Sequence, residues 1–133
     1  MKTKTVKQKV NFKNVSPKEV YDALMDSKKH SAFTGAKAVI SKKQGGKYYA
    51  YDGYHGGVHL QLIPGKKIVQ SWHAQNWPKG HFGKATFTMK KTKTGTQLSL
   101  VHSGIPDFDY KGINNGWKEF YWEKMKLYFA KKK

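Results

Sequence analysis

The stretch from Gly116 to Phe129, GWKEFYWEKMKLYF, decides the fold. On a helix with 100° per residue, its large apolar side chains fall on one broad face, whereas Glu119 and Glu123 fall on the opposite face. The central sector of the apolar face holds Trp117, Tyr121, Met125 and Tyr128, flanked by Phe120 and Leu127 on one side and by Trp122 and Phe129 on the other. Burying five or six such side chains contributes up to roughly 1.5–3 kcal/mol each. The stretch therefore predicts a helix that lies across a hydrophobic surface.

Length and composition predict one domain that spans residues 1–133. The chain has no cysteine, which excludes disulfides, thiolate zinc sites and a cysteine nucleophile. The charged segment Met1–Lys9 is followed by no apolar stretch of the signal-peptide kind, and no apolar run approaches membrane-spanning length. We therefore expect a soluble, cytoplasmic protein that does not associate with membranes.

The formal charge of +18 comes from 26 basic residues, all lysine, against 8 acidic ones. Such a charge attracts polyanions and gives salt-sensitive, nonspecific binding. Proteins that read nucleic-acid sequence rely on the planar fork of arginine, which this chain lacks. We therefore expect no specific nucleic-acid binding. A solvated lysine surface is favoured, with an acidic protein as a plausible partner and nonspecific polyanion binding as a weaker alternative.

The first third of the chain predicts a strand followed by two short helices. Apolar and polar residues alternate over Thr3–Asn14, which is typical of a half-buried strand. Ser16 and Glu19 form a capping box, with Pro17 at the first helical position of a helix that runs to about Met25. A second helix is expected from Asp26 or Ser27 to about Phe33, ending near Gly35.

From residue 36 onward the pattern predicts an antiparallel meander. The expected strands are Ala36–Ser41, Lys47–Asp52, Val58–Ile63, Lys67–Ala74, Ala85–Lys91 and Gln97–Ser103, with Gly53–Gly57 as a turn. A loop over Gly104–Asn114 leads to the last helix. The fold class is therefore α+β: a curved antiparallel sheet of six to seven strands wrapped around a long C-terminal helix.

Five segments carry a resemblance to a known family. They are GGKY at 45–48, PGKKIVQSW at 64–72, NWPKGHF at 76–82, HSGIP at 102–106 and GWKEFYWE at 116–123. In these segments the chain resembles the activators of heat-shock protein 90 ATPase homologues within the START-like superfamily, above all the C-terminal domain of the eukaryotic co-chaperone. The resemblance implies the helix-grip fold, a non-enzymatic co-chaperone role and a chaperone of the heat-shock protein 90 type as partner.

No constellation for metal binding or catalysis stands out. His55 and His59 are four residues apart, but Gly56 and Gly57 between them argue against a shared helix face. The other histidines have no carboxylate at ligand spacing, and no acidic pair is placed for acid–base chemistry. We therefore expect no catalytic residue, no metal, no cofactor and no enzymatic activity. An aromatase- or cyclase-type enzyme on this fold is the least supported alternative.

Aromatic residues from several expected elements converge on the last helix and predict the lining of a groove. The candidate ligand-binding residues are Phe33, Tyr48, Trp72, Trp77, Phe87, His102, Trp117, Tyr121 and Met125. Two interpretations are open, an apolar cavity and a filled core. His102 accordingly binds a ligand or pairs with a tyrosine hydroxyl or a backbone carbonyl. Because related helix-grip proteins bind lipids and polyketides, the resemblance implies a hydrophobic small molecule, held either by a co-chaperone or by a carrier without a chaperone role.

Overall fold

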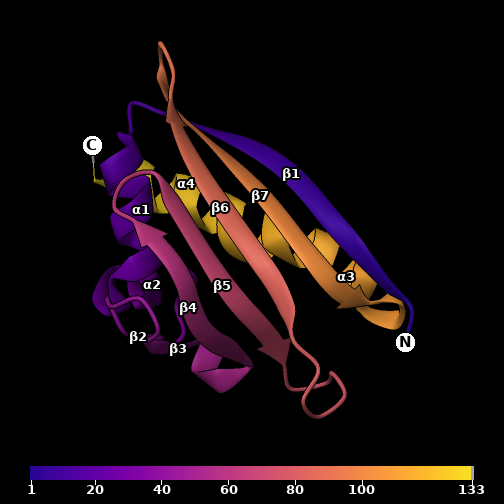
Figure 1. The fold of residues 1–133 in the computed structure, drawn as a ribbon. Helices are drawn as coiled ribbons and strands as arrows, with labels where there is room; N and C mark the ends of the chain where they lie inside the picture. The colour runs from indigo at the N-terminus through magenta and orange to yellow at the C-terminus, as the bar shows by residue number, and fades with distance from the viewer. Residues whose placement is uncertain (133) are drawn as a thin grey trace.

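The computed structural model describes residues 1–132 and shows a seven-stranded antiparallel sheet with a long C-terminal helical region across one face (Figure 1). The strand order is β1-β7-β6-β5-β4-β3-β2. The strands are β1 Thr3–Lys13, β2 Val39–Ile40, β3 Lys47–Ala50, β4 His55–Ile63, β5 Lys67–Ala74, β6 Gly83–Lys91 and β7 Gly95–Pro106. The helices are α1 Pro17–Met25, α2 Ser27–Thr34, α3 Tyr110–Gly116 and α4 Glu123–Lys131. The predicted α+β helix-grip fold is confirmed.

Local capping fixes the two short helices that follow β1. The Ser16 hydroxyl accepts a hydrogen bond from the Glu19 amide at 3.1 Å, and the Glu19 carboxylate accepts one from the Ser16 amide at 3.0 Å. Asp26 then begins α2, because its carboxylate accepts the Lys28 amide at 2.9 Å. Gly35 ends α2 with a φ of 78°, a left-handed conformation that favours glycine. Helix α2 lies beside β2, where the Ser27 hydroxyl accepts a hydrogen bond from the Ile40 amide at 2.8 Å, whereas α1 contacts β6 and β7 (Figure 1).

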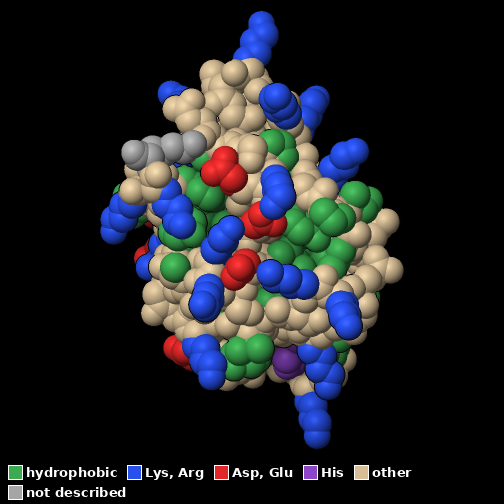
Figure 2. Space-filling model, turned by 90° about the vertical axis from the view of Figure 1, so that its left-hand side faces the viewer, with side chains coloured by type: hydrophobic (Ala, Val, Ile, Leu, Met, Phe, Trp, Pro, Cys, Tyr) green, Lys and Arg blue, Asp and Glu red, His purple; other side chains and the backbone are tan. Residues whose placement is uncertain are grey.

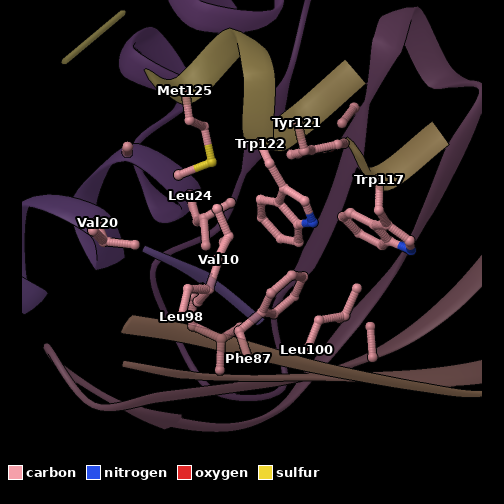
Figure 3. Packing of buried hydrophobic residues seen from close by; sticks show 14 of the residues in the cluster. Val10, Val20, Leu24, Phe87, Leu98, Leu100, Trp117, Tyr121, Trp122 and Met125 are labelled. Atoms are coloured by element: carbon pink, nitrogen blue, oxygen red, sulfur yellow. The ribbon is translucent and has the colours of Figure 1, made fainter. Parts of the chain in front are cut away.

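The core lies between the sheet and the C-terminal helical region. Register places Val10 opposite Leu98 and Leu100 opposite Phe87, so that β1, β7 and β6 present one continuous apolar face. Figure 3 shows Trp117 and Trp122 extending from the helical region toward this face. Five residues of the stretch that decides the fold are buried, namely Trp117, Tyr121, Trp122, Met125 and Phe129.

The C-terminal helical region differs from its prediction in extent and in regularity. The expected loop over Gly104–Asn114 is wrong: β7 continues to Pro106 by pairing with β1, and helix α3 begins at Tyr110. A π-helical segment, Trp117–Trp122, separates α3 from α4 and widens the turn. In this arrangement Tyr121 and Trp122 are both buried, whereas Phe120 and Leu127, expected on the edge of the apolar face, are exposed at 46% and 64%.

The turn predicted at Gly53–Gly57 is also wrong. A turn of 3₁₀ helix occupies Tyr51–Gly53, and β4 already begins at His55. Gly56 and Gly57 lie inside the strand, where the neighbouring backbone of Tyr48 and of Ser71 comes so close that only glycine fits. His55 is thereby brought into the sheet as an inward-facing, buried residue.

No helix within residues 1–132 is both long enough and apolar enough to cross a membrane.

Candidate functional site

A cavity of about 440 Å³ opens between the start of β4, the turn before it and helix α3. Its lining residues are Tyr51, Tyr54, His55, Trp72, Asp109, Gly112, Ile113, Gly116, Trp117, Phe120 and Tyr121. Gly112 and Gly116 are four residues apart on α3, so that two neighbouring positions on the helix face toward the cavity carry no side chain. The volume lies within the range of small-molecule sites.

The space directly between the sheet and the helical region is filled. A void of about 10 Å³ remains beside His30, Tyr48, Phe87 and Tyr121, which is at most the room for one water molecule. A filled core and a cavity thus coexist, because the cavity lies at one end of the core.

The predicted lining residues divide between these two regions. Three of them, Trp72, Trp117 and Tyr121, line the 440 Å³ cavity. The buried side chains Phe33, Tyr48, Trp77, Phe87, His102 and Met125 belong to the packed interior and do not line it.

His102 is wholly buried and pairs with the helical region. The Trp117 indole donates a hydrogen bond to His102 Nδ1 at 3.0 Å. Because the indole can only donate, His102 Nδ1 is an acceptor and the ring proton sits on Nε2. Burial lowers the pKa of His102 from 6.5 to about 3, which keeps the ring neutral. The predicted pairing with a tyrosine hydroxyl or a carbonyl is replaced by an indole partner.

A stack of rings connects the packed interior to the cavity wall. Trp72 packs edge-on against His102, with ring centroids 4.7 Å apart, and lies parallel to His55 at 4.6 Å. Since both Trp72 and His55 line the cavity, the stack makes its inner wall rigid and largely apolar.

A line of hydrogen bonds crosses the core and ends at this wall. His30 Nδ1 lies 3.0 Å from the Leu24 carbonyl oxygen, and His30 Nε2 lies 2.9 Å from the Tyr121 hydroxyl. The same hydroxyl lies 3.3 Å from His55 Nε2. Burial lowers the pKa of His30 to about 4 and that of His55 to about 3, so both rings are neutral near pH 7.

Asp109 is the one charged side chain among the lining residues. Its carboxylate accepts a hydrogen bond of 2.7 Å from the indole of Trp77, another predicted site residue. Trp77 does not line the cavity itself, but its hydrogen bond holds Asp109 in place at the edge of the cavity. Within residues 1–132, no three histidine, aspartate or glutamate side chains converge as a metal site would require.

The cavity-lining residues Tyr51, Tyr54 and His55 were missed by the sequence analysis. The Gly56-Gly57 pair predicts a turn, which leaves His55 outside the predicted strand. The α3 side was missed because Gly112 and the residues around it were assigned to a loop. Glycines four residues apart, at 112 and 116, were the one available signal of a helix face hollowed for a ligand.

Comparison with known sequences identifies relatives over nearly the whole chain. Residues 14–130 match the family described as Activator of Hsp90 ATPase homolog 1-like protein. The Activator of 90 kDa heat shock protein ATPase homolog of Dictyostelium discoideum is 36% identical over 129 residues, which are 96% of this chain and 33% of that protein. Homolog 1 of Homo sapiens is 34% identical over 115 residues, 86% of this chain and 34% of that protein. The chain therefore spans about a third of the length of these relatives.

Solved structures share the fold at lower identity. An HSP90 activator from Plasmodium falciparum superposes with a TM-score of 0.82 at 20% identity, covering 96% of both chains. A protein from Mesorhizobium loti superposes with a TM-score of 0.84 at 20% identity, covering 98% of this chain and 99% of that one. These likenesses show a common architecture.

Proposed function

This chain belongs to the Activator of Hsp90 ATPase homolog 1-like family, and we propose that it is a non-enzymatic, cytoplasmic co-chaperone module that binds an acidic surface of an Hsp90-type chaperone. The observation that carries the proposal is the family match combined with a surface dominated by lysine, with 26 lysines against 8 acidic residues. On the face shown in Figure 2, lysine side chains are spread among hydrophobic ones, and acidic groups are few. Such a surface accelerates encounter with an acidic partner.

The outer face of the sheet is the surface best suited to this partner. In the β1–β7 register, Lys7 lies opposite Val101 and Lys9 opposite Ser99. On the other side of β7, Lys84 lies opposite Ser103. Strand β7 contains no lysine itself, and Val101 is 41% exposed. The lysine rows of β1 and β6 therefore flank a neutral strip with an apolar centre, an arrangement that combines steering charges with a surface that can be desolvated.

The test mixes the purified protein with the Hsp90-type chaperone of its host and follows co-elution and ATP turnover at low and at physiological salt. We expect co-elution at physiological salt, tighter association at low salt, and a change in ATP turnover. Absence of both co-elution and a rate change at either salt concentration would remove the proposal.

A second function, retention of a hydrophobic small molecule, is favoured by the 440 Å³ cavity with its aromatic lining. The function is compatible with a carrier role and does not require the chaperone. A screen of hydrophobic compounds by NMR tests it. We expect the indole N–H signals of Trp72 and Trp117 to shift together, since both rings line the cavity. A response confined to surface lysines would count against it.

A further inference from the structure

The hydrogen bonds that end at His55 fix which of its ring nitrogens carries the proton. The Leu24 carbonyl can only accept, so His30 Nδ1 donates to it and His30 Nε2 is left as an acceptor. The Tyr121 hydroxyl has one proton, which it donates to His30 Nε2 at 2.9 Å. The Tyr121 oxygen is then free to accept the proton of His55 Nε2 at 3.3 Å. In this arrangement the lone pair of His55 lies on Nδ1.

His55 Nδ1 is therefore a hydrogen-bond acceptor without a partner in the described chain. The bond to Tyr121 is made by the other ring nitrogen, and no hydrogen bond to Nδ1 occurs within residues 1–132. The side chain is 5% exposed and lines the cavity, yet Nδ1 is not one of the unpaired buried atoms that are sealed from solvent. Because His55 lines the cavity and Nδ1 is not sealed from solvent, a donor on a ligand in the cavity can take the place of water at this lone pair.

The remaining lining selects against an anionic ligand. Lysine does not occur among the lining residues, in contrast to the rest of the surface, and the one charged group there is the Asp109 carboxylate. An anion would have to be desolvated against aromatic rings, beside this carboxylate and without a cation to pair with. The net charge of +18 would suggest anionic lipids as ligands. The lining of the cavity disfavours them.

We propose that this cavity binds a neutral, largely apolar alcohol or phenol whose hydroxyl donates a hydrogen bond to His55 Nδ1. The proposal rests on the second function above, that the cavity holds a hydrophobic small molecule, and it adds the chemical class and the anchor. Tyr121 and His30 act as positioning residues, because they hold the His55 ring in the tautomer that accepts.

Three probes of nearly equal size separate the alternatives: 2-naphthol, 2-methoxynaphthalene and 2-naphthoate. They share one apolar body and differ in having a neutral donor, no donor and a negative charge. We expect 2-naphthol to bind about three- to tenfold more tightly than the methoxy compound, the gain typical of one hydrogen bond. We expect 2-naphthoate to bind at least about tenfold more weakly than 2-naphthol. Isothermal titration calorimetry at pH 7 gives the affinities, and the ¹⁵N shift of His55 Nδ1 reports whether the nitrogen accepts the hydroxyl.

The variant His55→Phe keeps a ring on Trp72 and removes the acceptor. It should lose the preference for 2-naphthol over the methoxy compound. His59→Phe is the matched control, because His59 is buried on the same strand, stacks on Tyr48 at 5.3 Å and does not line the cavity. It should retain the preference. The wild-type comparison of probes stands by itself if His55→Phe does not fold.

The outcomes distinguish the inference from the function on which it rests. If none of the three probes binds, the ligand-holding function fails and the inference fails with it. If the probes bind equally, or 2-naphthoate binds best, the cavity holds small molecules but the assignment of a neutral donor to His55 Nδ1 is overturned. An unchanged Nδ1 shift at saturation with 2-naphthol would also overturn it.

Discussion

Trp117 on the C-terminal helical region donates its indole proton to His102 Nδ1 on β7 across 3.0 Å, inside a wholly buried environment. The bond joins the two halves of the helix-grip arrangement, because it is a directional contact between the helical region and the centre of the sheet. Apolar packing alone would allow the region to slide along the sheet, whereas directional bonds such as this one and the 2.7 Å bond from the Trp122 indole to Gln8 Oε1 select one position.

The variant His102→Leu should destabilise the protein by about 1–3 kcal/mol. Leucine fills much of the same space, but it leaves the Trp117 indole proton buried without an acceptor. Urea unfolding at pH 7 measures the change. His59→Leu is the control, because it replaces another buried histidine that accepts no hydrogen bond from an indole. It should lower the free energy of unfolding less than His102→Leu does. Equal losses in the two variants would show that the pair has no special role.

The variant Gly116→Ala should stabilise the fold and weaken ligand binding at once. Gly116 has helical dihedrals of −61° and −40°, and an added Cβ meets Phe120 at an ordinary 3.7 Å. Replacing glycine by alanine in a helix gains roughly 0.5–1 kcal/mol, measurable by urea unfolding. The new methyl group occupies the cavity, so that affinity for 2-naphthol should fall.

Gly35→Ala is the contrasting control, because its φ of 78° disfavours alanine, and it should lose stability. A loss of stability in Gly116→Ala would contradict the assigned helix.

Acid should unfold the protein through its buried histidines. Burial lowers the pKa values of His30, His55 and His102 from 6.5 to about 4, 3 and 3, respectively. Below about pH 6.5 the unfolded chain therefore binds more protons than the native state does. The stabilisation that these neutral histidines contribute is fully present above pH 6.5 and is lost as pH falls toward their native pKa values. The loss is about 1.4 kcal/mol per pH unit for each histidine between roughly pH 6 and 4.5.

Urea unfolding at half-unit pH intervals measures this slope. Burial also lowers the pKa of His59, so that four histidines contribute to the slope. His55→Phe removes one of them and should reduce the slope by about a quarter to a third. A slope that does not change in the variant would show that His55 is not buried in its neutral form.

Local signals in the sequence were enough for the elements whose structure depends on their neighbours in the chain. The capping box of Ser16 and Glu19 fixed the start of α1, and alternation fixed the inward faces of β6 and β7. The family segments, together with the apolar face around Trp117, were enough for the α+β architecture. Each of these signals acts over a few residues or repeats with a regular period.

The rest depends on contacts between distant residues. Gly56 and Gly57 signal a turn locally, but the close approach of neighbouring strands holds them inside β4, and only this contact turns His55 inward. The π-helical segment redistributes Phe120 and Trp122 between solvent and core, which a regular helical wheel does not anticipate. Whether aromatic side chains fill a groove or leave a cavity depends on summed volumes, and therefore on the three-dimensional packing of α3 against the start of β4.

The affinity of the Hsp90-type chaperone for two matched charge-reversal variants tests the co-chaperone proposal most directly. The first variant carries Lys7→Glu, Lys9→Glu and Lys84→Glu on the outer face of the sheet. The second carries Lys118→Glu, Lys126→Glu and Lys131→Glu on the C-terminal helical region, so that net charge falls equally in both. We predict that the sheet variant loses about tenfold or more in affinity at physiological salt, while the helix variant stays within about threefold of wild type. Equal losses in the two variants, or a larger loss in the helix variant, would contradict the sheet face as the binding surface.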